Sequence, residues 1–232
     1  MEKAIIIGGS GGIGSEIIKM LKKNNIYVIN IDKVPFEQND SLLKNITCDL
    51  TLTDIPALVD TIMKEENEIN YFISSIGYYG VKSLQTFSIE EYDKTLKVNL
   101  QIPTQFCVEL TKNMQKQNGG KLILISSAAA YIGSRDIPYS ISKAGMLGLL
   151  RAISKNTAGS NIFCYGIAPG IVKTKMSANQ SPQRQNDTIE RTLNKRMCNP
   201  DEIAKTVEFL IVKEEGYMNG SVIHMNNGVY MN

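Results

Sequence analysis

The 232-residue sequence predicts an α/β protein built on a doubly wound parallel sheet of about seven strands, with helices on both faces. Short apolar runs alternate with longer amphipathic stretches, as in β-α-β units. The runs are continuously apolar, which is typical of strands buried on both faces. A glycine-rich turn joins the first run to the first amphipathic stretch, which favours a Rossmann-type sheet. We expect one domain, residues 1–232, because no linker, repeat or low-complexity tract interrupts the pattern.

Each expected element follows from its own stretch of sequence. In the first expected helix, Ile13, Ile17, Ile18 and Leu21 recur at helical spacing and give one apolar stripe. Asn199 precedes Pro-Asp-Glu and is placed to cap a late helix. The expected strands are residues 4–7, 27–32, 71–76, 121–126, 161–167 and 221–225, and the expected helices are 13–24, 55–66, 88–116, about 139–157 and one from Pro200.

Composition excludes several classes of protein. A formal net charge of +2 gives no support for nucleic-acid binding, which usually needs a basic face. No apolar run approaches the length of a membrane span. The four cysteines form no C-x-x-C pair, so we expect neither a metal site nor disulfides. With no secretory signal at the N-terminus, the sequence predicts a cytoplasmic protein.

The turn GGSGGIG at residues 8–14 holds five glycines in seven positions. It is not an ATP-type phosphate loop, because Ser15 and Glu16 follow where that loop needs Lys and Ser or Thr. Between a strand and a helix, it predicts a pyrophosphate site on bare backbone. Asp32, which ends the next strand, is placed to bind the ribose hydroxyls and to repel a 2′-phosphate. This favours NAD over NADP, although Lys33 keeps NADP open.

Tyr139 and Lys143 are the sharpest catalytic signal. Residues four apart lie on one face of a helix. A phenol is a poor base at neutral pH, but a nearby ammonium favours its ionised form. The pair therefore predicts a proton donor and acceptor for interconverting an alcohol and a carbonyl. Ser127 ends the strand KLILISS at the edge where open α/β sheets bind ligands, and Ser126 is the alternative.

These motifs, in this order, resemble the short-chain dehydrogenase/reductase family along nearly the whole chain. The resemblance implies an NAD(H)-dependent oxidoreductase that interconverts a secondary alcohol and a ketone. Tyr139 would transfer the hydroxyl proton, and Ser127 would hold the substrate oxygen. Lys143 would lower the pKa of Tyr139 and bind the nicotinamide ribose. Asn99 would complete the proton relay.

The resemblance also implies the residues that hold the dinucleotide. Asp49 and Leu50 match an adenine-contacting pair after the third strand, and Val172 and Thr174 match groups that reach the nicotinamide carboxamide. Two departures are notable: Ile7 stands where relatives have Thr, with Ser10 as a substitute, and Ser74-Ser75 stand where relatives have two Asn. The implied cofactor-binding set is Gly8, Ser10, Gly11, Gly12, Ile13, Gly14, Asp32, Asp49, Leu50, Ser75, Ile76, Gly77, Tyr139, Lys143, Pro169, Gly170, Val172 and Thr174.

Residues 175–199 are expected to form a substrate lid. Ile189, Leu193 and Met197 recur four apart and predict one helical stripe. Five cations stand there against two acids, which favours an anionic small-molecule substrate; a solvated helix face is the alternative. The cations are Lys175, Arg184, Arg191, Lys195 and Arg196, and the acids are Asp187 and Glu190.

Two other functions stay open. A 3-oxoacyl-carrier-protein reductase would normally prefer NADP, against which Asp32 speaks. A non-catalytic dinucleotide-binding regulator would have no need of the Tyr139 and Lys143 pair. Enoyl reductases of the same superfamily separate their Tyr and Lys by six residues and are disfavoured. The resemblance further implies a homotetramer, or a homodimer, whose interfaces include the helices that hold Asn99 and Tyr139.

Overall fold

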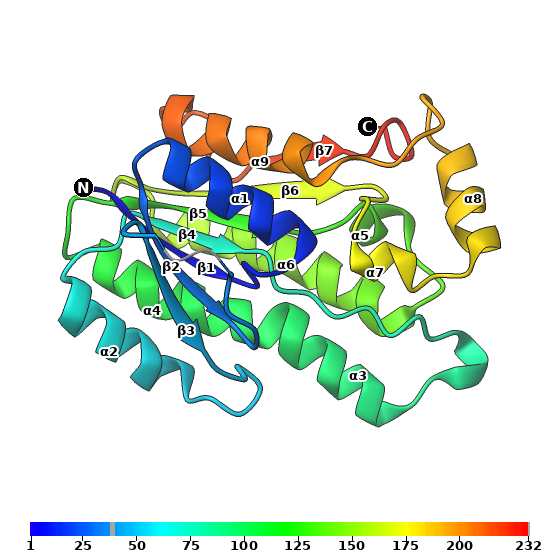
Figure 1. Cartoon of the computed structure of the whole chain (residues 1–232), viewed down its shortest axis with the longest axis horizontal. Coiled ribbons are helices and arrows are strands. Elements are labelled where there is room, and N and C mark those ends of the chain that lie inside the picture. The colour runs from blue at the N-terminus through cyan, green and yellow to red at the C-terminus, as the bar shows by residue number, and fades with distance from the viewer. Residues whose placement is uncertain (38–39, 232) are drawn as a thin grey trace.

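Seven parallel strands form a single sheet in the order β3-β2-β1-β4-β5-β6-β7, as seen in a computed structural model that describes residues 1–37 and 40–231 (Figure 1). This confirms the predicted Rossmann-type sheet. The chain leaves β1 for the β2 side and later returns beside β1 as β4, so the strand order reverses there. The strands are β1 Lys3–Ile7, β2 Tyr27–Asp32, β3 Leu43–Thr47, β4 Tyr71–Ser74, β5 Gly120–Ile125, β6 Ile162–Pro169 and β7 Val222–Met225.

Helices cover both faces of this sheet (Figure 1). Helices α1 and α9 pack together on one face, and α2, α4 and α6 lie on the other. The α-helices are α1 Gly12–Lys23, α2 Ile55–Glu66, α3 Ile89–Leu96, α4 Ile102–Met114, α5 Ala129–Ile132, α6 Ile137–Asn156, α7 Lys175–Ala178, α8 Pro182–Glu190 and α9 Pro200–Glu208; the shorter turns are η1 Leu84–Thr86, η2 Lys97–Gln101 and η3 Phe209–Lys213.

Two apolar layers fill the space between sheet and helices. Ile17, Ile18 and Leu21 of α1 are fully buried against one face, so three members of the predicted stripe pack as expected. Phe72 of β4 stacks on Phe106 of α4 on the other face, with ring centroids 5.5 Å apart. These layers hold the carboxyl ends of the strands in fixed positions.

Three elements differ from the sequence-based expectation. Strand β3 has no apolar run and is partly exposed along its length, so only the family resemblance predicted it. The expected helical region around 88–116 is present as α3, η2 and α4 in direct succession, but the helix widens to a π-helical turn at η2, which contains Asn99. The expected stripe of Ile189, Leu193 and Met197 does not form, because α8 ends at Glu190 and Leu193 is 66% exposed.

Candidate active site

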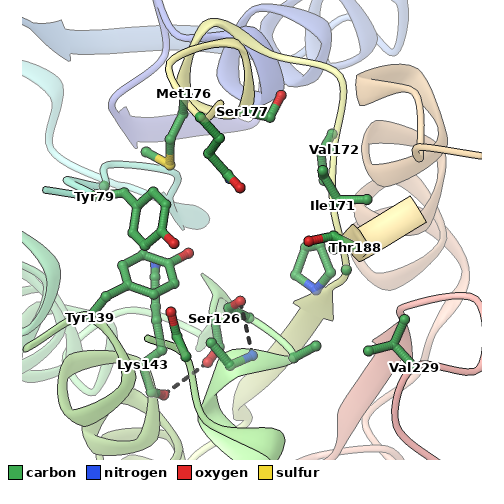
Figure 2. A pocket seen from close by; sticks show the side chains of 18 of the residues that line it. Tyr79, Ser126, Tyr139, Lys143, Ile171, Val172, Met176, Ser177, Thr188 and Val229 are labelled. Atoms are coloured by element: carbon green, nitrogen blue, oxygen red, sulfur yellow. Dashed lines mark hydrogen bonds between the residues drawn. The ribbon is translucent and has the colours of Figure 1, made fainter. Parts of the chain in front are cut away.

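A cleft of about 280 Å³ opens at the carboxyl ends of the strands, next to the point where the strand order reverses. This is where open α/β sheets bind ligands. Tyr139 and Lys143 line one side of the cleft, and Ile171 and Val172 line the opposite side (Figure 2). Helices α7 and α8 cover the outer end of the cleft.

The glycine turn between β1 and α1 is shaped first by contacts within the protein. Gly8 has a φ of +78°, and a Cβ there would lie 2.6 Å from the backbone of Ile76. A Cβ on Gly9 would lie 2.3 Å from Oδ1 of Asn30, and one on Gly14 would lie 2.3 Å from the carbonyl oxygen of Gly8. These three glycines therefore let two strand ends and a helix start approach closely.

The other two glycines leave bare backbone at the start of α1. Gly11 and Gly12 are exposed, and no side chain caps the first N–H groups of the helix. A Cβ on Gly11 would meet only the Gly8 carbonyl oxygen, at 3.4 Å, and one on Gly12 would lie 2.7 Å from Thr174. Uncapped N–H groups at a helix start bind anions. The residues present therefore fit a dinucleotide pyrophosphate.

Ser10 ties this turn to the end of β2. Its hydroxyl donates to the carbonyl oxygen of Val34 at 2.6 Å and accepts from Asn30 at 3.1 Å. Its N–H donates to Asp32 at 3.0 Å. Ser10 thus anchors the turn to the end of β2 through three hydrogen bonds.

Lys33 is held away from Asp32 by an ion pair with Asp49, whose carboxylate oxygen lies 2.9 Å from Nζ. The Asp49 carboxylate also accepts from the N–H and hydroxyl of Thr51, at 2.9 and 2.6 Å. The Thr51 hydroxyl and the Lys33 ammonium lower the pKa of Asp49 to about 2. Leu50, beside it, is buried in the core.

Residues that follow two of the strands, and that are predicted to bind the cofactor, also line the cleft. Ser75 donates from its N–H to Ile7 at 3.0 Å, which places Ser75-Ile76-Gly77 along one wall. On the opposite wall, β6 ends at Pro169, and Gly170 donates to Met225 at 3.0 Å. Beyond it, Ile171 and Lys173 both bond to Cys198 at 2.9 Å, which fixes the segment that carries Val172.

Helix α6 carries Tyr139 and Lys143 and begins at a buried cap. The Asp136 carboxylate accepts from the N–H of Tyr139 and from the N–H of Lys82, both at 3.0 Å. The Tyr139 hydroxyl points into the cleft (Figure 2). Nζ of Lys143 lies 5.8 Å from the centre of the Tyr139 ring and donates to the carbonyl oxygen of Ile125 at 2.9 Å.

Burial sets the protonation of this pair. Desolvation raises the pKa of Tyr139 to about 12, against a smaller lowering by the Ser127 hydroxyl. Desolvation also lowers the pKa of Lys143 to about 8. The expectation that Lys143 lowers the pKa of Tyr139 is therefore not met in this structure, because the Lys143 ammonium bonds the backbone and loses its own hydration.

The two serines at the end of β5 point to different partners. Ser126 is buried, and its hydroxyl donates to the backbone carbonyl of Lys143 at 2.9 Å (Figure 2). Ser127 is only partly buried, and its hydroxyl interacts with Tyr139 and accepts from the N–H of Ala129 at 3.1 Å. This arrangement favours Ser127 over Ser126 as the residue that meets a substrate oxygen.

Asn99 lies behind the cleft and is fully buried. Its side chain accepts from the N–H of Tyr78 at 2.6 Å and donates to the carbonyl oxygen of Tyr78 at 2.8 Å. It also donates to the hydroxyl of Ser142 at 3.1 Å, and Ser142 in turn donates to the Tyr139 carbonyl at 2.8 Å. Asn99 therefore joins the segment after β4 to α6.

The cleft gathers part of the predicted site. Several predicted residues do not line the cleft: Asn99, the glycines of the turn, Ser10, Asp32, Asp49 and Leu50. The predicted residues that line it are Ile13, Ser75, Ile76, Gly77, Ser127, Tyr139, Lys143, Pro169, Gly170, Val172 and Thr174.

Sequence reasoning missed several residues around Tyr139. Tyr79 packs edge-on against it, with ring centroids 4.7 Å apart. Arg184 of α8 donates to the Tyr79 hydroxyl. Asp136 could have been found as the Asp that precedes Ile-Pro at a helix start. The sequence marked Arg184 only as one of the lid cations, and nothing in it signals Tyr79 or the contact between the two, because α8 reaches Tyr79 only through the fold.

Among the described residues, no group of His, Cys, Asp and Glu side chains could hold a metal ion. The same part of the chain contains no helix with the length and apolar character that crossing a membrane requires.

Comparisons with known proteins identify the family. A family model described as enoyl-(acyl carrier protein) reductase matches residues 10–230. The 3-oxoacyl-[acyl-carrier-protein] reductase FabG of Buchnera aphidicola (subspecies Baizongia pistaciae) is 31% identical, over 98% of this chain and 97% of its own. The human dehydrogenase/reductase SDR family member 4 is 27% identical, over 97% and 86%. The chain belongs to the short-chain dehydrogenase/reductase family. It is thus an oxidoreductase that acts on CH–OH groups or the matching carbonyls, with a dinucleotide cofactor.

Solved structures of this family share the fold. The TT0495 protein of Thermus thermophilus superposes with a TM-score of 0.92 at 24% identity, with 98% of each chain covered. A structure titled ElxO with NADP bound gives 0.90 at 19% identity, with the same coverage. The similarity in fold covers nearly the whole of each chain.

Proposed function

We propose that this enzyme interconverts a ketone and a secondary alcohol with NAD(H), using Tyr139, Lys143, Ser127 and Asn99. The proposal rests chiefly on one observation: the hydroxyl of Tyr139 points into a cleft beside Ser127 and Lys143. The opposite wall holds Val172 and Thr174, and Thr174 lies against Gly12 of the glycine turn, which supports a dinucleotide that extends from the cleft toward this turn.

In the proposed reaction, Tyr139, Ser127 and Lys143 each have a separate role. The reduced nicotinamide, when bound, supplies the hydride to the carbonyl carbon. Tyr139 gives its phenolic proton to the carbonyl oxygen, so that C=O becomes CH–OH, and the reverse reaction returns the proton. A pKa of about 12 keeps Tyr139 protonated and ready to donate. Ser127 orients the substrate oxygen, and a bound ribose would accept from Lys143.

Asn99 has a positioning role in this proposal. Its three hydrogen bonds fix the backbone of Tyr78 and the side chain of Ser142. Since Ser142 lies on α6, one turn from Tyr139, these bonds set the distance between α6 and the wall after β4.

The preference for NAD over NADP is supported by Asp32 and Lys33. The Asp32 carboxylate stands at the end of β2, bonded to the turn through Ser10, where it would repel a 2′-phosphate. Lys33, the nearest cation in the sequence, is already paired with Asp49. The ElxO structures with NADP or NADPH bound, at 19% identity, favour the alternative.

A 3-oxoacyl-carrier-protein reductase is the second candidate. It is supported by the FabG relative at 31% identity. The enoyl reductase description of the family model fits less well, because Tyr139 and Lys143 lie four residues apart on α6. A non-catalytic regulator is the third candidate.

The decisive experiment measures reduced-nicotinamide absorbance with a panel of ketones and secondary alcohols, using NADH and NADPH. We expect turnover with NADH, and a loss of about 10²–10⁴-fold in kcat for Tyr139→Phe. Calorimetric binding of NADH to both proteins is the control, since Phe keeps the ring. If Tyr139→Phe binds NADH and retains full turnover, the role of Tyr139 is wrong. If no ketone or alcohol reacts and the dinucleotide still binds, the regulator explanation is favoured.

We also propose a homotetramer, or a homodimer, in the cytoplasm, with residues 175–199 as the lid. The lid is supported by α7 and α8, which cover the outer end of the cleft. The location is supported by four free cysteines, two of them buried. Analytical ultracentrifugation tests the assembly against a chain mass of 25.7 kDa.

A further inference from the structure

Three arginines line the outer part of the active-site cleft. Arg135 lies just before α6, Arg184 lies on α8, and Arg191 follows the end of α8. Asp187 is the single acidic residue in the lining, and its carboxylate accepts a hydrogen bond from Gln183 at 2.8 Å. The electrostatic balance of this part of the cleft is therefore positive.

Two other cations of the lid are already paired with acidic side chains. Lys195 pairs with Glu190 at 3.5 Å, and Arg196 pairs with Glu202 at 2.7 Å. In residues 1–37 and 40–231, no ion pair includes Arg135, Arg184 or Arg191. Three cations that share one cleft without a counter-ion attract an anion. Arg135 and Arg191 are exposed and Arg184 is only partly exposed, so the solvated-face explanation fits Arg184 least well.

Arg184 is placed close to the proposed proton donor. Its guanidinium donates to the hydroxyl of Tyr79 and lies 5.5 Å from the centre of the Tyr79 ring. The Tyr79 ring is in edge contact with that of Tyr139, at 4.7 Å. One aromatic side chain therefore separates the guanidinium from the phenol, so a small molecule can reach both. A guanidinium that is already oriented loses little freedom when it binds a carboxylate in bidentate form.

We propose that Arg184, assisted by Arg135 and Arg191, binds the carboxylate of a short oxo acid whose ketone faces Tyr139. In the reverse direction the substrate is the matching hydroxy acid. This inference rests on the proposed function, because it names the substrate class of the same cleft. Tyr79 is the positioning residue that holds Arg184 at the distance a short chain spans.

The test compares acids with neutral counterparts of the same carbon skeleton. The probes are 3-oxobutanoate and 4-oxopentanoate, their methyl esters, and the N-acetylcysteamine thioester of 3-oxobutanoate. In the wild type we expect kcat/KM to be about tenfold or more higher for an acid than for its ester, because a charge-assisted bond contributes at least that factor. In Arg184→Gln we expect this ratio to fall about tenfold. Lys195→Gln, a cation of the same lid that is already paired, is the matched control, and its ratio should stay at the wild-type value.

Several outcomes would overturn the inference while leaving the ketoreductase function intact. One is an ester or thioester reduced as well as the acid, which would favour a carrier-bound substrate. Another is an Arg184→Gln defect confined to KM for the dinucleotide, which would assign the arginine to the cofactor pyrophosphate. If no probe is reduced with either cofactor, the proposed function fails for these ketones. The anion site is then decided by calorimetric binding of 4-oxopentanoate, and equal affinity in wild type and Arg184→Gln, or no binding to either, would reject it.

Discussion

At the scale of single residues, the glycine turn serves two separate purposes. Gly8, Gly9 and Gly14 are required because backbone or side-chain atoms of the protein already occupy the space of a Cβ. Gly11 has room for one and lies exposed at the start of α1. Gly12 likewise has no room for a Cβ, which would lie 2.7 Å from Thr174, so contacts within the fold restrict four of the five glycines and the proposed pyrophosphate site accounts for Gly11.

Substitutions at Gly11 and Gly14 separate these two purposes. For Gly11→Ala we expect a free energy of unfolding within about 0.5 kcal/mol of wild type and an affinity for NADH lowered about tenfold, because the methyl group would stand where phosphate meets backbone. For Gly14→Ala we expect a loss of stability above about 2 kcal/mol, since Cβ would lie 2.3 Å from the Gly8 oxygen. Urea unfolding and calorimetric binding measure the two effects. Unchanged affinity in Gly11→Ala would place the phosphates elsewhere.

We predict that the choice between NAD and NADP depends on the charge of Asp32. Asp32→Asn keeps an acceptor for the Ser10 N–H and removes the charge that repels a 2′-phosphate. We expect the ratio of kcat/KM for NADH to that for NADPH to fall about tenfold or more, which corresponds to removing one close like-charge repulsion. Lys33→Gln, which removes the neighbouring charge of opposite sign, is the matched control for Asp32→Asn. A wild type that already prefers NADPH would contradict the role given to Asp32.

The sequence alone predicts local patterns, but it does not predict which distant residues become neighbours in the fold. The Tyr139 and Lys143 pair could be predicted because four residues on a helix fix their relation, and Ser127 because a strand end fixes its edge. The contact between Tyr79 and Arg184 could not be predicted, because it joins segments 105 residues apart in the chain. The raised pKa of Tyr139 could not be predicted for the same reason, because it follows from burial, which the sequence does not report.

At the scale of elements, α6 depends on its first residue. Asp136 is 1% exposed and accepts from two N–H groups, one in α6 and one in the segment after β4. A cap of this kind stabilises a helix start, and here it also joins two walls of the cleft. The start of α6 and the position of Tyr139 are therefore set together.

Removing this cap should weaken both the fold and the site. For Asp136→Ala we expect the free energy of unfolding to fall by about 2–4 kcal/mol, because the helix loses its cap and the buried Lys82 N–H loses its acceptor. Asp136→Asn, which keeps one acceptor oxygen, should lose about half as much. Urea denaturation followed by circular dichroism measures both variants. If Asp136→Ala were as stable as wild type, the cap would have no structural role.

The strands that carry a buried apolar run were predicted correctly, whereas β3 and the helical stripe of the lid show where apolar patterns fail as a guide. Strands β1, β2, β5 and β6 are buried apolar runs, and the sequence shows them directly. Strand β3, at the edge of the sheet, is only partly buried and needs no apolar run. In the lid, Ile189 and Leu193 have helical spacing, but α8 ends between them, where the hydroxyl of Thr192 donates to the carbonyl oxygen of Ile189 at 2.7 Å.

At the scale of the whole molecule, one cleft collects residues from Ile13 near the start of the chain to Val229 near its end. A parallel sheet produces this arrangement because all its carboxyl ends lie on one edge. The same arrangement buries a cation beneath the cleft. Lys143 is 4% exposed, and desolvation alone accounts for the fall of its pKa to about 8.

This buried cation makes the stability of the whole protein depend on pH. The pKa of Lys143 falls on folding from 10.5 to about 8, so the unfolded chain binds more protons between these values. Stability must therefore rise with pH across that window, by at most about 3 kcal/mol from this group. The effect of Tyr139 on stability has the opposite sign and begins at higher pH. The pKa of Tyr139 rises on folding from 10.0 to about 12, so its ionisation favours the unfolded chain only above pH 10.

Comparison with Lys143→Met isolates the effect of the lysine, because Tyr139 and all other groups titrate in both proteins. Near pH 7 we expect the variant to be more stable than wild type by about 1–3 kcal/mol, since Met keeps the volume and removes the buried charge. Near pH 10 the wild type should recover most of this difference, because its lysine is then neutral in the folded state. Urea unfolding at several pH values measures the difference directly. A difference that stays constant from pH 7 to pH 10 would show that Lys143 is solvated or paired in solution, and the proposed protonation state of the site would then be wrong.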